Sequence, residues 1–213
     1  MATKIADRPF DAELEKKVYD ESYYRNHTQY YEKGISGFVD FLVNNFEFDS
    51  IADIGCGTGA FVSPFQNMVN MSDTDYMKVI GFDFSVGAGV VQELDSNHYV
   101  EADLTVPGST ILAKDFDIVM SLEVYEHLLP KFEEIYLNNV FGLNPKHVII
   151  SCAAPGQWGR HHVNCIGKEG VQAKVAEMFP NYKVNEELTQ KFGEIKKLAS
   201  FYRKNTTIFD REK

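Results

Sequence analysis

A short apolar segment followed by three alternating glycines constrains the fold of this chain more than any other feature. Residues 50–54 read as a buried strand, and from Asp53 to Gly59 the sequence is D-I-G-C-G-T-G. Glycine adopts positive φ easily and, because it lacks a Cβ atom, lets backbone N–H groups come close to a ligand. The pattern predicts a strand, a tight turn and a helix, with a nucleotide-type cofactor bound at the turn.

The glycines alone leave the cofactor open. Gly55, Gly57 and Ala60 satisfy the dinucleotide pattern G-x-G-x-x-G/A, which fits NAD or FAD. A P-loop is excluded, because Gly59 is followed by Ala-Phe and not by the Lys-Ser/Thr pair that holds phosphates and magnesium. The carboxylate of Asp53 would repel a pyrophosphate but attract the ammonium and sulfonium groups of S-adenosylmethionine (SAM), and so it favours SAM.

Length and composition are typical of one globular domain. The chain has 213 residues, 44% of them hydrophobic, which is enough for a substantial core but leaves little room for a separate catalytic domain. No apolar run approaches the roughly 18 residues that span a bilayer, and residues 1–10 lack the apolar stretch of a secretory signal. Because three scattered cysteines also fit reduced thiols, we expect a cytoplasmic protein. We expect it to be a monomer or a homodimer.

The formal net charge of −10 at pH 7 bears on the kind of partner. Sequence-independent affinity for nucleic acids comes mainly from Lys and Arg contacts to phosphates, so this charge disfavours tight binding to a long polyanion. Basic residues do gather between Lys191 and Lys204, but such runs usually form a solvated helix face. We therefore expect a small-molecule partner rather than a nucleic acid.

Hydrophobic periodicity predicts alternating strands and helices. Short apolar runs predict buried strands at 50–54, 79–84, 98–104, 116–122, 147–153 and 205–209. Helical spacing occurs over 10–46, 61–69, 87–96, 131–141, 168–179 and 188–198. This alternation predicts an α/β fold with a Rossmann-like, doubly wound sheet, mostly parallel, and helices on both faces. We expect residues 1–48 to form a helical cap segment of the same domain as residues 49–213.

Acidic residues end the first four predicted strands: Asp53, Asp83, Asp103 and Glu123. Ligands of a doubly wound sheet bind beyond the carboxyl ends of its strands, so we expect these side chains to converge. Asp83, 24 residues after Gly59, can accept hydrogen bonds from both ribose hydroxyls of an adenosine.

The third acid has two possible roles. Asp103 can accept a hydrogen bond from an adenine amino group while Phe84 and Leu104 sandwich the ring. It can equally form a local turn.

These residues, in this order, resemble the class I SAM-dependent methyltransferases over roughly residues 51–209. The resemblance implies a seven-stranded sheet with an antiparallel last strand, a helical N-terminal segment over the site, and S-adenosyl-L-homocysteine as product. It also implies that Ser121, Leu122 and Glu123 lie beside the methionyl part of SAM. The expected cofactor-binding residues are Asp53, Gly55, Cys56, Gly57, Gly59, Asp83, Phe84, Asp103, Leu104, Ser121 and Leu122.

Methyl transfer to oxygen or nitrogen is an in-line displacement, in which the protein must align the reactants and remove a proton. The loop after the fifth predicted strand offers His161 and His162 as bases, and Glu123 is a further candidate. For the acceptor we expect Arg160 to bind a carboxylate or phosphate and Trp158 to form an aromatic wall. Tyr23 and Tyr24, from a tyrosine-rich stretch, are expected to cap the acceptor pocket.

A metal-assisted reaction stays open as well. Glu123, Glu126 and His127, with His161 or His162, are residues that can hold a divalent ion, as in the small-RNA terminal 2′-O-methyltransferases that this E-x-x-E-H resembles. The acidic composition argues against RNA, and we predict no metal. An NAD-linked oxidoreductase and a SAM-binding protein without catalysis are also compatible with the sequence.

Overall fold

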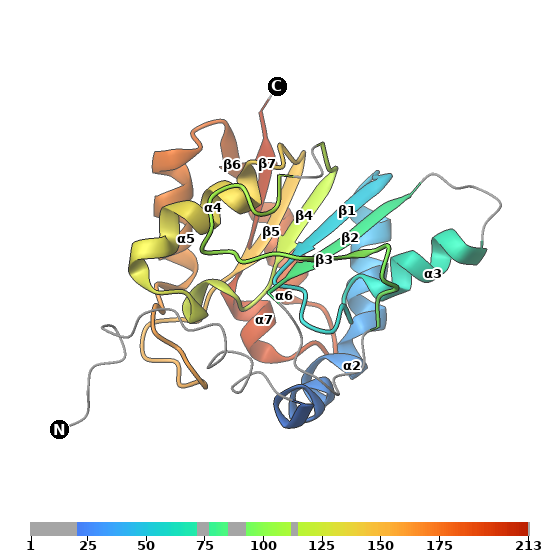
Figure 1. Cartoon of the computed structure of the whole chain (residues 1–213). Coiled ribbons are helices and arrows are strands. Elements are labelled where there is room, and N and C mark those ends of the chain that lie inside the picture. Colours follow the sequence, from blue (N-terminus) through green and yellow to red (C-terminus); the bar gives the residue numbers. More distant parts are fainter. Residues whose placement is uncertain (1–20, 72–76, 85–92, 112–114, 213) are drawn as a thin grey trace.

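A seven-stranded sheet lies at the centre of the computed structural model, which describes residues 21–71, 77–84, 93–111 and 115–212 (Figure 1). The strands follow the order β3-β2-β1-β4-β5-β7-β6 across the sheet. Their bounds are β1 (Ser50–Ile54), β2 (Lys78–Asp83), β3 (Tyr99–Glu101), β4 (Ile118–Ser121), β5 (His147–Ser151), β6 (Tyr182–Val184) and β7 (Thr206–Arg211).

Strand direction agrees with the sequence-based expectation. The neighbouring pairs from β3 through β5 are parallel, whereas β7 is antiparallel to both β5 and β6. The predicted mostly parallel, doubly wound sheet with an antiparallel last strand is therefore confirmed. Because β1 and β4 are adjacent and parallel, the loops that follow them leave the sheet at the same edge.

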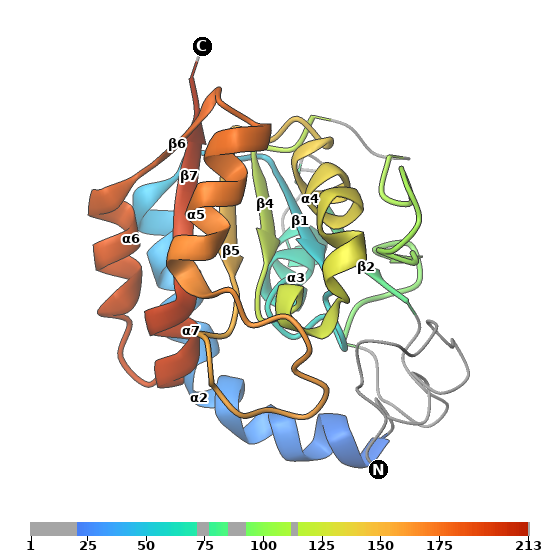
Figure 2. The ribbon, with the colours of Figure 1, turned by 90° about the vertical axis from the view of Figure 1, so that its left-hand side faces the viewer.

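Helices cover both faces of the sheet (Figures 1 and 2). Figure 2 looks onto the face covered by α4 (Glu133–Phe141) and α5 (Gly167–Met178). The other face packs against α2 (Glu21–Asn45), α3 (Ser63–Met71), α6 (Glu186–Gly193) and α7 (Ser200–Asn205).

Alternation along the strands explains why both layers form. Ile51 and Ile118 face the α2 layer, whereas Ala52 and Val119, one position later in each strand, face the α4 layer. Successive side chains of a strand point to opposite faces, so a strand buried on both sides needs a continuous apolar run. Because the central strands are buried on both faces, continuous apolar runs in the sequence identify them.

The edges of the elements differ from the predictions. β3 spans only three of the seven residues predicted at 98–104. β6 was not predicted, because Lys183 interrupts its apolar character. A short 3-10 turn (Pro130–Phe132) precedes α4, so the helix starts two residues later than predicted. Of the helix predicted over 87–96, the described part, residues 93–96, is not helical, and the rest lies outside the described residues.

The helix predicted over 188–198 is only partly formed: α6 ends at Gly193, residues 194–199 are not helical, and α7 begins at Ser200. Asn185 caps α6, its side chain accepting a hydrogen bond from the backbone N–H of Leu188. After Gly193 the chain turns and places Leu198 against α2, where a Cβ atom on Gly34 would lie 2.6 Å from the Leu198 Cα atom. The absence of a side chain at Gly34 of α2 thus permits the close approach of the segment between α6 and α7.

Within the described residues, no helix combines the length and the apolar character that crossing a bilayer requires.

The packing of α2 can be tested with two neighbouring positions. Leu42 is completely buried in the core, whereas Val43 is 55% exposed. We expect Leu42→Ala to lower the free energy of unfolding by about 2–5 kcal/mol, because it removes buried methyl groups and leaves a cavity. Val43→Ala should change it by less than about 0.5 kcal/mol. Urea unfolding measures both, and equal small effects would show that α2 is not part of the folded core.

Candidate active site

The glycine loop after β1 is held in a conformation that other residues rarely adopt. Gly55, Gly57 and Gly59 have φ values of 79°, 56° and 84°. The backbone N–H groups of Gly55 and Cys56 both donate to the carbonyl oxygen of Phe82, at 2.7 and 3.0 Å, and so tie the loop to β2. A Cβ atom on Gly55 would lie 2.4 Å from Cγ2 of Val124. The loop after β1 therefore packs directly against the segment that follows β4.

Two carboxylates flank this loop, as predicted from the strand ends. Asp83 accepts a hydrogen bond from the N–H of Gly57 at 2.7 Å and one from the N–H of Phe84 at 2.8 Å. Asp53 is 3% exposed at the end of β1. Burial raises the pKa of Asp53 well above its usual value, and the negative charge of Asp83 raises it further. A cation bound here would relieve that repulsion.

The side chain of Cys56 lies against β2. Cys56 is buried, and its Sγ atom would lie 2.7 Å from a Cβ atom on Gly81 of β2. Burial raises the pKa of this thiol well above its usual value, so it stays neutral. Any contribution of Cys56 to a cofactor therefore comes from its backbone.

The residues predicted to surround adenine lie near the end of β3. Oδ1 of Asp103 accepts hydrogen bonds from the N–H and hydroxyl of Thr105, at 2.8 and 2.6 Å, which is the turn-forming role considered from the sequence. Leu104 is 7% exposed and Phe84 is half-buried. The contact of these three residues with adenine stays a prediction.

The side chains of Ser121 and Leu122 are buried in the interior of the protein. The hydroxyl of Ser121 is fully buried and makes 2.6 Å hydrogen bonds with the carbonyl oxygen of Ile54 and the hydroxyl of Tyr136. Leu122 is 8% exposed and packs in the core layer beside α2. The Ser121 hydroxyl therefore links β4 to β1 and α4, and this residue can face a cofactor only through its backbone.

Glu123, which follows β4, is hydrogen-bonded to residues of β5 and α7. Its φ of 56° is in the left-handed region, a conformation that costs about 1–2 kcal/mol for a residue with a side chain. Its N–H donates to the Ser151 hydroxyl of β5 at 2.8 Å, and its carboxylate oxygens accept from Nδ2 of Asn205 at 3.1 and 3.3 Å. The same amide nitrogen lies 3.1 Å from Oε1 of Gln157. These bonds hold the Glu123 carboxylate in one position.

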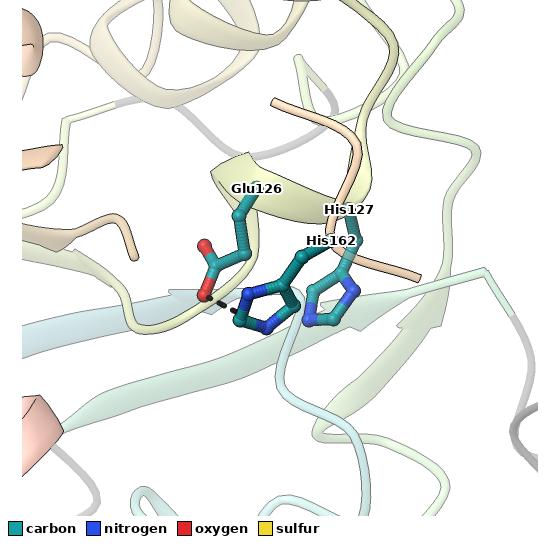
Figure 3. Close-up of side chains that lie close together, drawn as sticks. All are labelled: Glu126, His127 and His162. Carbon is teal, nitrogen blue, oxygen red and sulfur yellow. Dashed lines mark ion pairs between the residues drawn. The ribbon is translucent and has the colours of Figure 1, made fainter. Parts of the chain in front are cut away.

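A second cluster, made of Glu126, His127 and His162, lies next to this acid (Figure 3). The carbonyl oxygen of Glu126 accepts hydrogen bonds from the N–H groups of Val163 and Asn164, at 2.8 and 3.1 Å, so the loop after β5 is attached to the 3-10 turn Tyr125–His127. One ligand atom from each of the three cluster residues lies within 4.8 Å of the others. Carboxylate and imidazole donors of this kind can hold a proton or a divalent ion.

Glu126 is the most unusual group in the site. Its side chain is completely buried, and neither carboxylate oxygen has a hydrogen-bond partner among the described residues. Burial raises the pKa of Glu126 well above its usual value, and the nearby negative charge of Glu123 raises it further. A buried carboxyl group without a hydrogen-bond partner favours its neutral form or a nearby cation.

The tautomer of His162 follows from its neighbours. Its Nδ1 atom lies 3.1 Å from the carbonyl oxygen of Gln157, which can only accept, so Nδ1 carries the proton. In the neutral imidazole, Nε2 then keeps its lone pair and lies 4.0 Å from Oε1 of Glu126. Figure 3 shows these two side chains pointing toward one another.

The structure brings together only some of the predicted catalytic and acceptor residues. His162 is in the cluster, whereas His161, with a φ of 58°, and Glu123 lie outside this group of donor atoms. Trp158 is 92% exposed, and Arg160 is exposed on the same loop. Tyr23 and Tyr24 belong to α2, but their side chains lie outside the described residues.

Sequence reasoning missed Asn205, Gln157 and Ser151, which position Glu123 and His162. Asn205 is 82 residues from the acid that it contacts. Only the topology of the sheet, with β7 inserted beside β5, brings these residues to Glu123. No local motif in the sequence carries that information.

A family model described as a methyltransferase domain matches residues 52–143, which include the glycine loop, the strand-end acids and the Glu126 turn. This part of the chain matches the methyltransferase-domain family. The matched range includes all of the residues that the sequence assigned to cofactor binding. The dinucleotide alternative finds no support in this match. A comparison with curated proteins found no match to the sequence.

Solved structures show that the methyltransferase domain has the class I fold. A TehB-like SAM-dependent methyltransferase from Corynebacterium glutamicum is 18% identical, with 94% of this chain and 100% of that chain covered and a TM-score of 0.59. Magnesium protoporphyrin IX methyltransferase from Synechocystis PCC 6803, with bound SAM, is 16% identical, with 97% and 99% covered and a TM-score of 0.61. The methyltransferase domain of bacterial CtHen1-CN is 18% identical, with 85% and 98% covered and a TM-score of 0.52.

Replacing Glu126 by glutamine should remove a specific pH dependence of stability. The folded state raises the pKa of this carboxyl, so it binds the proton more tightly than the unfolded state does, and the free energy of unfolding falls as pH rises above the unfolded-state pKa. We expect the wild type to lose stability relative to Glu126→Gln as pH rises above about 4.5, the usual pKa of a glutamate. Urea unfolding at each pH, with a chelator present, measures the difference. Parallel pH profiles would contradict a raised pKa of this buried carboxyl.

Proposed function

We propose that the chain transfers the methyl group of SAM to an oxygen or nitrogen atom of a small polar acceptor and releases S-adenosyl-L-homocysteine. One observation carries this proposal: the contact between Gly55 and Val124 places the cofactor loop beside Glu123 and the cluster of Glu126, His127 and His162. A donor held at the loop and a proton acceptor at the cluster then face the same space. We further propose a cytoplasmic protein, monomer or homodimer.

For the cofactor, the proposal assigns each part of SAM to residues at the end of a strand. Asp83 would accept hydrogen bonds from the ribose hydroxyls, and the backbone of Gly55 to Gly59 would approach the methionyl part. Asp103, Phe84 and Leu104 would surround adenine. Asp53, whose carboxyl is destabilised as an anion by burial and by Asp83, would gain most from the positive charges of SAM.

The acceptor half uses His162 as the base. Its Nε2 lone pair can take the proton from an acceptor hydroxyl or amine as the methyl group is transferred from sulfur. The positive charge of the imidazolium that forms would in turn favour the ionised form of Glu126, whose Oε1 atom lies 4.0 Å away. Because Nδ1 is held by Gln157, the ring keeps the orientation that this step requires.

A second candidate function is a metal-assisted methyltransferase of the RNA 2′-O type. The observation that favours it is that Glu126, His127 and His162 bring three donor atoms together, one of them from a buried carboxylate that has no hydrogen-bond partner among the described residues. Such donors suit manganese, zinc or magnesium, which would polarise the acceptor oxygen. The net charge of −10 favours the small-molecule acceptor over RNA.

Cofactor binding can be tested at Asp83. We expect Asp83→Ala to weaken the binding of S-adenosyl-L-homocysteine by about 1–3 kcal/mol, because it removes charged hydrogen bonds to the ribose. Asp40→Ala, at an exposed position of α2, makes the same change of charge and should leave the affinity unchanged. Isothermal titration calorimetry measures both. Unchanged affinity in Asp83→Ala would exclude the ribose role, and no binding to the wild type would exclude the proposed function.

Chelation and a His162 variant separate the two candidate functions. With an acceptor found by screening metabolites with radiolabelled SAM, His162→Gln should lower turnover by about 100-fold or more if His162 is the base. EDTA should then have no effect on the wild type. Loss of turnover in EDTA and its recovery with Mn²⁺ would instead support the metal-assisted candidate. Full cofactor binding with no methylation of any acceptor, RNA included, would favour a catalytically silent protein.

A further inference from the structure

A cavity lies beside the catalytic groups, at the edge of the sheet where β5 ends. It is bounded by the loop after β5, by the first turn of α5 and by α7. Its volume of about 570 Å³ is typical of small-molecule sites. Figure 2 shows the beginning of α5 next to α7 at this edge. The residues used in the argument are Gln157, Trp158, Lys168, Phe201, Lys204 and Asn205.

The charge of the cavity is opposite to that of the protein. Lys168 and Lys204 line it together with one acid, Glu169, although the chain as a whole carries a charge of −10. Neither lysine takes part in an ion pair within the described part of the chain. Two ammonium groups without ion-pair partners favour an anionic group such as a phosphate or carboxylate. The first turn of α5, to which Lys168 belongs, adds the positive end of a helix dipole.

Aromatic side chains supply a second kind of contact. Trp158, the single tryptophan of the chain, is 92% exposed, and the half-buried Phe201 lines the same cavity. A tryptophan is rarely left so open to water, because its ring contributes a large apolar area when it is covered. A planar ring of a ligand would cover both.

The cavity is connected to the catalytic groups by shared residues. Asn205 lines the cavity and donates to the Glu123 carboxylate at 3.1 Å. Gln157 lines it as well, and its carbonyl oxygen accepts from Nδ1 of His162 at 3.1 Å. A ligand anchored here would therefore lie next to both acidic and basic groups of the proposed active site.

From these contacts we infer that the methyl acceptor is a small molecule with a planar ring and a phosphate or carboxylate group, anchored in this cavity by Lys168, Lys204 and Trp158. This inference rests on the proposed function. It adds that the acidic protein selects an anionic acceptor through one basic cavity.

Tryptophan fluorescence tests the inference without knowledge of the natural acceptor. Phenyl phosphate and benzoate are titrated into the full chain with S-adenosyl-L-homocysteine present, and neutral phenol serves as the matched probe. We expect saturable quenching, with at least tenfold tighter binding of one or both anions than of phenol. The stronger of the two anions identifies the anchoring group. Linear, non-saturating quenching or equal affinity for phenol would overturn the inference.

Two matched double variants locate the site. Lys168→Gln with Lys204→Gln should weaken binding of the stronger anion at least tenfold. Lys183→Gln with Lys196→Gln, two exposed lysines outside the cavity, makes the same change of net charge and should leave it unchanged. Wild-type affinity in the first variant, with wild-type circular dichroism, would overturn the assignment. Calorimetry with S-adenosyl-L-homocysteine is run in parallel, so failure of the cavity alone is distinguished from failure of the proposed function.

Discussion

The contact between Gly55 and Val124 determines how the rest of the site is arranged. β1 and β4 are parallel neighbours, so their following loops leave the sheet together, and the absence of a side chain at Gly55 lets these loops touch. One loop carries the glycines that we propose bind the cofactor, and the other carries Glu123 and Glu126. Any side chain at position 55 would push the two loops apart, and the proposed sites of the methyl donor and of the proton acceptor would no longer face the same space.

Around that contact, the protein maintains groups that are unfavourable for stability. Glu123 adopts a left-handed backbone conformation, and Glu126 is buried beside it without a hydrogen-bond partner among the described residues. Such features persist where the surrounding structure holds them, and they concentrate at functional sites. Here Ser151 and Asn205 hold Glu123, while backbone bonds from Val163 and Asn164 hold the turn that carries Glu126.

The sequence predicts the central sheet and the cofactor edge well, because both depend on local patterns. Buried strands need continuous apolar runs, and the strand-end acids follow from parallel topology, so Asp53 and Asp83 lie at the glycine loop as expected. Which of the two histidines, His161 or His162, joins the cluster with Glu126 and His127 depends on the path of an irregular loop. The role of Asn205 depends on an insertion of β7 between β5 and β6, and no local pattern reports either of these.

A crystal structure with bound S-adenosyl-L-homocysteine tests the central claim most directly. The account predicts ribose hydroxyls on the Asp83 carboxylate and a sulfur atom directed toward the space between Glu123 and His162. A sulfur atom directed away from both residues, or a ligand that leaves the loop of Gly55 to Gly59 without contact, would contradict it.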